Sequence, residues 1–105
     1  MPPAGRVSSP LSLESCVVAT ADHLSSELSG EVVILSLTDG VYYGLDAVGA
    51  LIWRSLGEPR TVRDVVADVT RQYAVDPAQC EHDVLAFLED LRAHQLAKVV
   101  DGDAG

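Results

Sequence analysis

The spacing of apolar residues changes once along the chain, from the alternation typical of strands to the period of about 3.6 residues typical of helices. Strand-like runs cover 16–20, 31–37 and 41–45. Helical spacing follows over 47–56, 62–73 and 77–95. This order predicts an α+β domain in which a three-stranded antiparallel sheet is followed by three helices that cover one face of the sheet.

The second and third strand-like runs are joined by Thr38-Asp39-Gly40, which is a hairpin signal. A two-residue turn would mix apolar and small residues on both faces, whereas a three-residue turn gives one fully apolar face. The three-residue turn pairs Leu37 with Val41, Leu35 with Tyr43 and Val33 with Leu45. It also places Gly40 in the left-handed conformation, directs Tyr43 into the core, and directs Tyr42 away from it beside Ser36 and Ile34.

The three helices have readable ends. Asp46 can cap the first helix, with Gly57 at its stop, and Thr61 can cap the second. Asp76 followed by Pro77 is the clearest helix start in the chain.

The third helix carries more apolar residues than one core contact usually needs. They form two neighbouring stripes, one with Cys80, Val84, Phe87 and Leu91, and the other with Leu85, Leu88 and Leu96. A stripe left over after packing would line a groove, although a helix wedged between two partners would have the same pattern.

The strand 41–45 would lie at an edge of the predicted sheet. Edges are usually protected by Lys or Pro, and this one reads Val-Tyr-Tyr-Gly-Leu with neither. Such an edge is an aggregation liability, a dimer contact between third strands, or a docking site for an extended peptide.

Composition bounds the fold and the partners. With 105 residues, 48% of them hydrophobic, the chain is expected to form one globular domain over 13–100, between flexible segments at 1–12 and 101–105. No apolar run is long enough to span a membrane and no signal peptide is evident, so a cytoplasmic location is expected. The net charge of −9 disfavours a phosphate backbone as partner.

The residues that usually carry chemistry are present without the required spacing. His23, His82 and His94 form no metal-binding motif, Cys16 and Cys80 form no CxxC pair, and no glycine-rich phosphate loop occurs. We therefore expect no catalytic residues, no metal and no cofactor, with both cysteines as free thiols. A DNA-binding function is also disfavoured, because the third helix is acidic.

Three segments resemble the PqqD-like family of peptide-recognition elements. They read VVILSLTDGVYYGLDAVGALIW, TVRDVVADVTRQYAVDP and DVLAFLEDLRAHQL, and within them Tyr43, Leu45, Gly49, Ile52 and Trp53 match best. The resemblance implies a winged-helix-like fold that binds the leader segment of a ribosomally made precursor peptide. It further implies that the leader adds as a strand beside the third strand and lies against the third helix.

Carried over by position, the resemblance implies a set of peptide-binding residues. The strand would supply Val41, Tyr42, Tyr43, Gly44 and Leu45, and the helix would supply Cys80, Asp83, Val84, Phe87, Asp90 and Leu91. Asp83 and Asp90 would face basic leader residues, while Tyr43 and Trp53 also fit a plain core role.

Within this family, the chain resembles most the freestanding leader-binding subunits of split lasso-peptide maturation systems. The implied partner enzyme is a transglutaminase-like cysteine protease, with an ATP-dependent cyclase acting afterwards. Leader-binding proteins that serve radical enzymes in quinone-cofactor or thioether pathways are the close alternative, and a DNA-binding regulator is a more distant one. Pairing of third strands into a homodimer also stays open.

Overall fold

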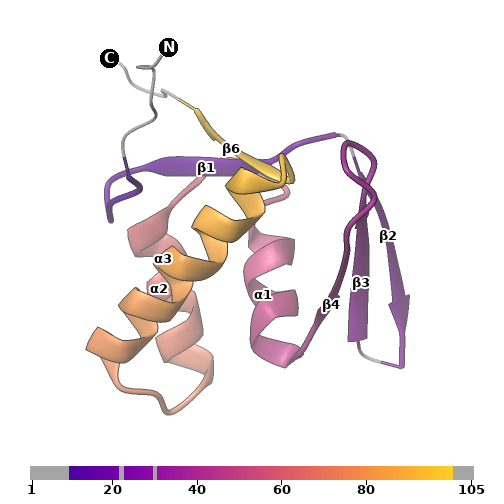
Figure 1. The fold of residues 1–105 in the computed structure, drawn as a ribbon. Coiled ribbons are helices and arrows are strands. Elements are labelled where there is room, and N and C mark those ends of the chain that lie inside the picture. The colour runs from indigo at the N-terminus through magenta and orange to yellow at the C-terminus, as the bar shows by residue number, and fades with distance from the viewer. Residues whose placement is uncertain (1–9, 22, 30, 101–105) are drawn as a thin grey trace.

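The computed structural model describes residues 10–21, 23–29 and 31–100 of the chain (Figure 1). Its helices are α1 (Ala47–Ser55), α2 (Val62–Gln72) and α3 (Pro77–Ala93). Its strands are β1 (Cys16–Ala19), β2 (His23–Leu28), β3 (Glu31–Ser36), β4 (Tyr42–Leu45), β5 (Arg60–Thr61) and β6 (Ala97–Val100).

The strands form two separate antiparallel sheets, in the orders β5-β1-β6 and β2-β3-β4. In Figure 1 the second sheet stands at the right beside α1, and β1 and β6 lie across the upper ends of the helices. The prediction of an α+β domain with antiparallel strands and three helices is confirmed.

The identity of the strands in the hairpin sheet differs from the prediction. The first predicted strand, 16–20, forms β1 in the other sheet, and the hairpin is completed by β2 instead. The apolar spacing predicts no strand at 23–28, because the sequence HLSSEL offers few apolar residues. An edge strand with one solvated face needs few, and hydrogen bonding to β3 is sufficient to hold it.

The hairpin register is shifted by one residue on β3. The pairs are Leu35 with Tyr42, Ile34 with Tyr43, Val33 with Gly44 and Val32 with Leu45. The connection is therefore a four-residue loop, 37–40, closed by a hydrogen bond from the Ser36 main-chain N–H to the Val41 carbonyl (2.9 Å).

As a consequence, the core face of β3 carries Val32, Ile34 and Ser36 rather than Val33, Leu35 and Leu37. Our face assignment for β3 was wrong because both faces of EVVILSL are apolar, so the pattern does not fix the register. Ser36 can be fully buried since its hydroxyl donates to the His94 carbonyl (3.2 Å). Three parts of the hairpin prediction are confirmed: Gly40 has φ of +73°, Tyr43 packs on the core, and Tyr42 points outward. The predicted three-residue turn and the position of Tyr42 beside Ser36 and Ile34 were wrong, since Tyr42 lies opposite Leu35.

All three predicted helix caps are confirmed. The side chains of Asp46, Thr61 and Asp76 accept hydrogen bonds from the main-chain N–H three residues onward, at 2.9, 3.1 and 2.9 Å. Helix α3 stops at Ala93, two residues before the predicted end, because Gln95 adopts a left-handed φ of +63° that turns the chain into β6.

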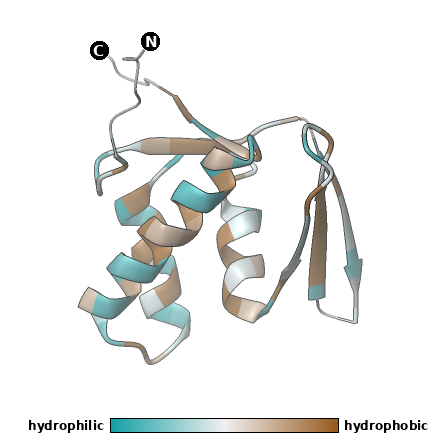
Figure 2. Ribbon diagram, in the orientation of Figure 1, coloured by the Kyte–Doolittle hydropathy of each residue, from teal (hydrophilic) through white to brown (hydrophobic). Residues whose placement is uncertain are grey.

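The hydrophobic core lies between the helices and both sheets, and Figure 2 shows apolar residues on the inward faces of these elements. Leu11, which lies within the predicted N-terminal segment 1–12, packs on this core. Leu11 is buried, and its N–H donates to Glu89 Oε2 on α3 (2.8 Å). The rest of that segment, 1–9, and the tail 101–105 lie outside the described residues.

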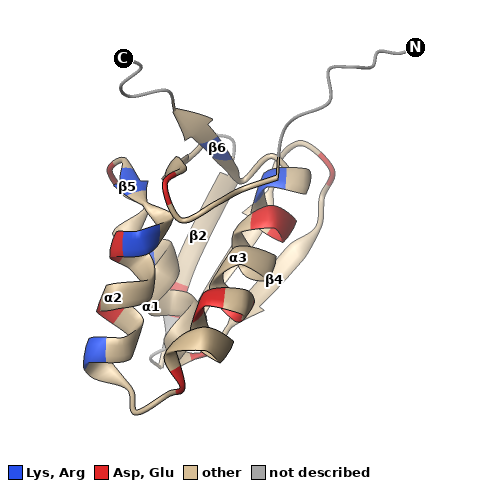
Figure 3. Ribbon diagram, turned by 90° about the vertical axis from the view of Figure 1, so that its left-hand side faces the viewer, with Lys and Arg blue, Asp and Glu red and all other residues tan. Residues whose placement is uncertain are grey.

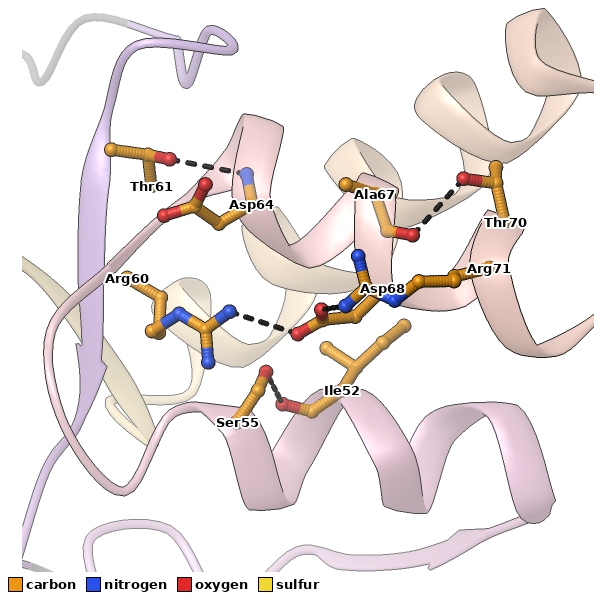
Figure 4. Close-up of polar contacts among 9 residues, drawn as sticks. All are labelled: Ile52, Ser55, Arg60, Thr61, Asp64, Ala67, Asp68, Thr70 and Arg71. Carbon is orange, nitrogen blue, oxygen red and sulfur yellow. Dashed lines mark hydrogen bonds and ion pairs between the residues drawn. The ribbon is translucent and has the colours of Figure 1, made fainter.

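A polar cluster joins α2 to the turn that precedes it (Figure 4). Asp68 accepts from Arg60 of β5 at 2.8 Å and from Arg71 one turn along α2. The Ser55 hydroxyl at the end of α1 donates to the Ile52 carbonyl (2.7 Å). The Arg60–Asp68 pair ties α2 to β5, which leads into it, whereas the Ser55 hydrogen bond lies within α1.

Candidate functional site

A groove of about 570 Å³ lies between the end of β4, helix α1 and helix α3. Of the residues predicted to bind peptide, the groove brings together Gly44, Leu45, Cys80, Asp83, Val84 and Phe87. The strand and the helix that sequence reasoning linked are thus the two walls of one cavity.

The remaining predicted site residues lie elsewhere around the groove. Tyr42 is 71% exposed on the outer face of the sheet, and Leu91 is completely buried in the core. Val41 and Tyr43 belong to the hairpin end of the sheet, and Asp90 is exposed about one turn beyond Phe87 along α3.

Helix α1 supplies the largest share of the lining that the residue-by-residue prediction missed, three of seven residues. It contributes Val48, Gly49 and Ile52, and further lining comes from Asp46, Val69, Val75 and Gln79. A Cβ atom on Gly49 would lie 3.3 Å from Leu45 Cβ, so the glycine allows α1 to approach β4 closely. The sequence did contain a signal for the part of the groove formed by α1, since Gly49 and Ile52 are among the residues that carry the family resemblance.

The α3 wall combines deep apolar atoms with an outer polar rim. Cys80 and Val84 are buried, Phe87 is partly buried, and Asp83 is exposed. Burial, together with the charge of Asp83, raises the pKa of the Cys80 thiol. Cys80 is therefore an apolar wall rather than a thiolate nucleophile.

The outer edge of β4 presents hydrogen-bonding groups beside this groove. Ser36 and Val41 form a hydrogen-bonded pair, so by the alternation of antiparallel ladders Tyr43 and Leu45 also bond to β3. Tyr42 and Gly44 then direct their main-chain N–H and C=O groups away from β3. Because β4 is the end strand of its sheet, these groups are open to an added strand.

At the hairpin end, the two walls are joined by polar contacts. His94 Nδ1 lies 2.7 Å from Asp39 Oδ2, and the rings of His94 and Tyr43 meet edge to face with centroids 5.5 Å apart. The hydrogen bond from His94 lowers the pKa of Asp39. Burial, and secondarily the charge of Asp90, raises the pKa of Tyr43 to about 12.

The rim of the groove carries two carboxylates, and Figure 3 shows further acidic positions along the ribbon of α3. Asp46 and Asp83 line the groove from opposite walls, and each accepts a hydrogen bond from a neutral donor, the Gly49 N–H and the Gln79 amide, both at 2.9 Å. Arginines are paired with other carboxylates, for example Arg54 with Glu27 and Arg60 with Asp68. The lining itself contains no Lys or Arg.

Among residues 10–21, 23–29 and 31–100, no group of three or more His, Cys, Asp or Glu side chains is arranged to hold a metal ion. In the same part of the chain, no helix combines the length and the apolar character needed to cross a membrane.

Comparison with known proteins gives matches at the level of family and of fold. Residues 31–97 match the family described as coenzyme PQQ synthesis protein D (PqqD). The solved structure of TbiB1 in complex with the TbiA(beta) leader peptide is 34% identical, with a TM-score of 0.69 over 77% of this chain and 94% of that chain. No curated protein sequence matches the chain.

A second solved structure, lasso peptide synthetase B1 complexed with the leader peptide, is 23% identical. It has a TM-score of 0.67 over 78% of this chain and 96% of that chain, and at this identity it shows a shared fold alone.

Proposed function

Because the chain belongs to the PqqD family, we propose that it is a non-catalytic recognition element that binds the leader segment of a ribosomally made precursor peptide. The observation that carries this proposal is the open edge of β4 directly beside an apolar groove. A peptide in extended conformation can satisfy both, with its backbone on the strand and its side chains in the groove. The similarity to TbiB1, whose structure contains a leader peptide, supports this ligand class.

The proposed binding site contains the predicted residues in distinct roles. Tyr42 and Gly44 would exchange main-chain hydrogen bonds with the leader. Side chains of the leader that point toward α3 would meet Phe87, Val84 and Cys80, which lie behind the rim. Affinity would come mainly from this apolar wall, because exposed ion pairs contribute only about 0–1 kcal/mol each.

The acidic rim would select the leader's charge. A leader residue that leaves the groove between Asp46 and Asp83 passes two carboxylates without a bonded cation among the described residues. A Lys or Arg at that point would be favoured, and an acidic residue would be disfavoured. The same acidic surface of α3 argues against DNA as the ligand.

We further propose that the chain delivers the leader to a separate enzyme, a leader peptidase of a lasso-peptide pathway. The partner that the sequence resemblance suggests is a transglutaminase-like cysteine protease. The resemblance of the sequence to freestanding leader-binding subunits of split lasso-peptide systems favours this pathway over one with a radical enzyme. Co-purification of the chain with the protease or the radical enzyme encoded in the same gene cluster distinguishes these two partners.

The test of leader binding is a fluorescence anisotropy titration. The probe is the labelled leader of the precursor peptide encoded beside this chain, with the TbiA(beta) leader as a second probe. We expect saturable binding that Phe87→Asp abolishes. The matched control is His82→Asp, which adds the same charge to an exposed position of α3 that does not line the groove.

Two outcomes would contradict the proposal. If neither leader binds the wild-type chain, leader recognition is wrong. If Phe87→Asp remains folded by circular dichroism and binds as tightly as His82→Asp, the groove is not the binding site. Light scattering without peptide tests the competing homodimer, in which the β4 edges of two copies would pair and raise the mass with concentration.

A further inference from the structure

The two elements that wall the groove, β4 and α3, converge at one end. They approach each other at the hairpin and diverge toward the end of β4 and the beginning of α3, with α1 between them (Figure 1). The groove lies in the wide part, lined by residues such as Leu45, Cys80 and Asp83. The narrow end lies beyond the lining residues, where Tyr43 of β4 meets His94, the residue that follows α3.

Three contacts at His94 connect the hairpin to α3 at this narrow end. The imidazole donates from Nδ1 to Asp39 Oδ2 in the hairpin loop (2.7 Å). The same ring packs edge to face on Tyr43, with centroids 5.5 Å apart. The main-chain carbonyl accepts from the buried Ser36 hydroxyl (3.2 Å). We refer to the contacts of His94 with Asp39, Tyr43 and Ser36 as the His94 clasp.

The side-chain part of the clasp is not explained by folding alone. The Ser36 contact satisfies a buried hydroxyl and uses the His94 main chain, so any residue at position 94 could accept it. The imidazole of His94 and the carboxylate of Asp39 are both partly exposed, and leaving them unlinked would bury no unpaired polar group. The side-chain contacts of His94 hold the β3–β4 hairpin at a fixed separation from α3.

We propose that His94 is a positioning residue for the leader: its side chain fixes the separation of β4 and α3 at the narrow end, beyond the groove lining, which holds the added strand in one register. This inference rests on the proposed function, because it assumes that the leader occupies the groove. A strand added at Tyr42 and Gly44 must fit between the two walls that the clasp joins. With the clasp intact, β4 and α3 are already at the separation that the leader requires, so binding of the leader does not have to order these two elements.

The experiment measures leader affinity and hydrogen exchange on the same variants. The variants are His94→Ala, which removes the contacts with Asp39 and Tyr43 and also the 3.8 Å approach of Nε2 to Asp90 on α3, His94→Asn, which keeps an N–H donor near the Nδ1 position, and Asp39→Asn, which removes the acceptor charge. His82→Ala on the exposed face of α3 is the control. The probes are the two labelled leaders named above.

We expect His94→Ala to weaken leader binding by about three- to tenfold, the range of one lost hydrogen bond, with partial recovery in His94→Asn. His94→Ala and Asp39→Asn should be non-additive, since both act on the same contact: the first removes its donor and the second removes the charge of its acceptor. A leader shortened so that it no longer reaches Tyr42 should bind the wild type and His94→Ala equally. If His94 had a merely structural role, His94→Ala would weaken the binding of the full-length leader and of the shortened leader by the same factor.

A measurement without peptide keeps this inference separate from the proposed function. Loss of the clasp should speed hydrogen exchange at the Ser36 and Gly40 amides, which close the hairpin loop, and leave α2 amides unchanged. If the wild type binds neither leader, leader recognition fails, and exchange still decides whether the clasp fixes the loop. Equal affinity and equal exchange in His94→Ala and the wild type would overturn the role of His94.

Discussion

Replacement of Gly44 by proline tests strand addition at β4 directly. The main-chain N–H of Gly44 points away from β3, so proline at this position removes no hydrogen bond from the sheet. It does remove the donor that an added leader strand would use, and its ring occupies the space of that strand. The matched control is Gly44→Ala, which keeps the N–H, and a Cβ atom there would meet nothing within 4 Å.

The expected loss follows from the single missing donor. An unsatisfied leader carbonyl at a partly buried edge costs about 1–3 kcal/mol, which corresponds to roughly 5- to 150-fold weaker binding. Gly44→Ala should bind within about twofold of the wild type. It keeps the main-chain N–H and the β3–β4 hydrogen bonds, and its Cβ atom displaces no neighbouring residue.

The assay is the anisotropy titration on both variants, with thermal melts to verify that each is folded. If Gly44→Pro is folded and binds the leader as tightly as Gly44→Ala, the leader does not pair with this edge. The reasoning from ladder alternation would then be refuted, even if the groove itself still bound the leader.

Three further predictions concern charged and polar side chains. Because the pKa of Tyr43 is raised to about 12, the unfolding free energy should fall as pH rises from about 10 through 12, and Tyr43→Phe should remove this fall in alkaline denaturation series. Because the pKa of Asp39 is lowered, its contribution to stability should be lost as pH falls below the ordinary value of 3.8, and Asp39→Asn should flatten that decline in melts between pH 6 and 3. Asp83→Asn should weaken binding of a basic leader by less than about fivefold, and the effect should vanish at high salt; a larger loss would mean that charge outweighs the apolar wall.

The helices were predictable from sequence because their signals are local. Asp46, Thr61 and Asp76 each bond to a main-chain N–H three residues away, so the evidence for each cap lies within one turn. The strands depend on partners that are distant in sequence. β1 pairs with β6, and β2 was missed because an edge strand needs little apolar character of its own.

The site was predictable where one element carried the signal alone. The apolar excess of α3 and the unprotected edge of β4 both lie in continuous segments, and they turned out to face the same groove. The register of β3 was not predictable, because its two faces are almost equally apolar and a loop one residue longer exchanges them. The His94 clasp was not predictable either, since it joins residues 55 positions apart.

The wider arrangement explains why one helix has more apolar residues than its core contact requires. Cys80, Val84, Leu88 and Leu91 form the buried stripe of α3, which crosses the two stripes expected from sequence. Phe87 lies beside that stripe, on the side that faces β4, and it is only partly buried. The partly exposed ring of Phe87 leaves apolar surface in water, which is unfavourable for an isolated domain. The open edge of β4 is also unfavourable, because it is a template for pairing with another strand. A single extended peptide would cover both, so the features that folding leaves unexplained have one common explanation in binding.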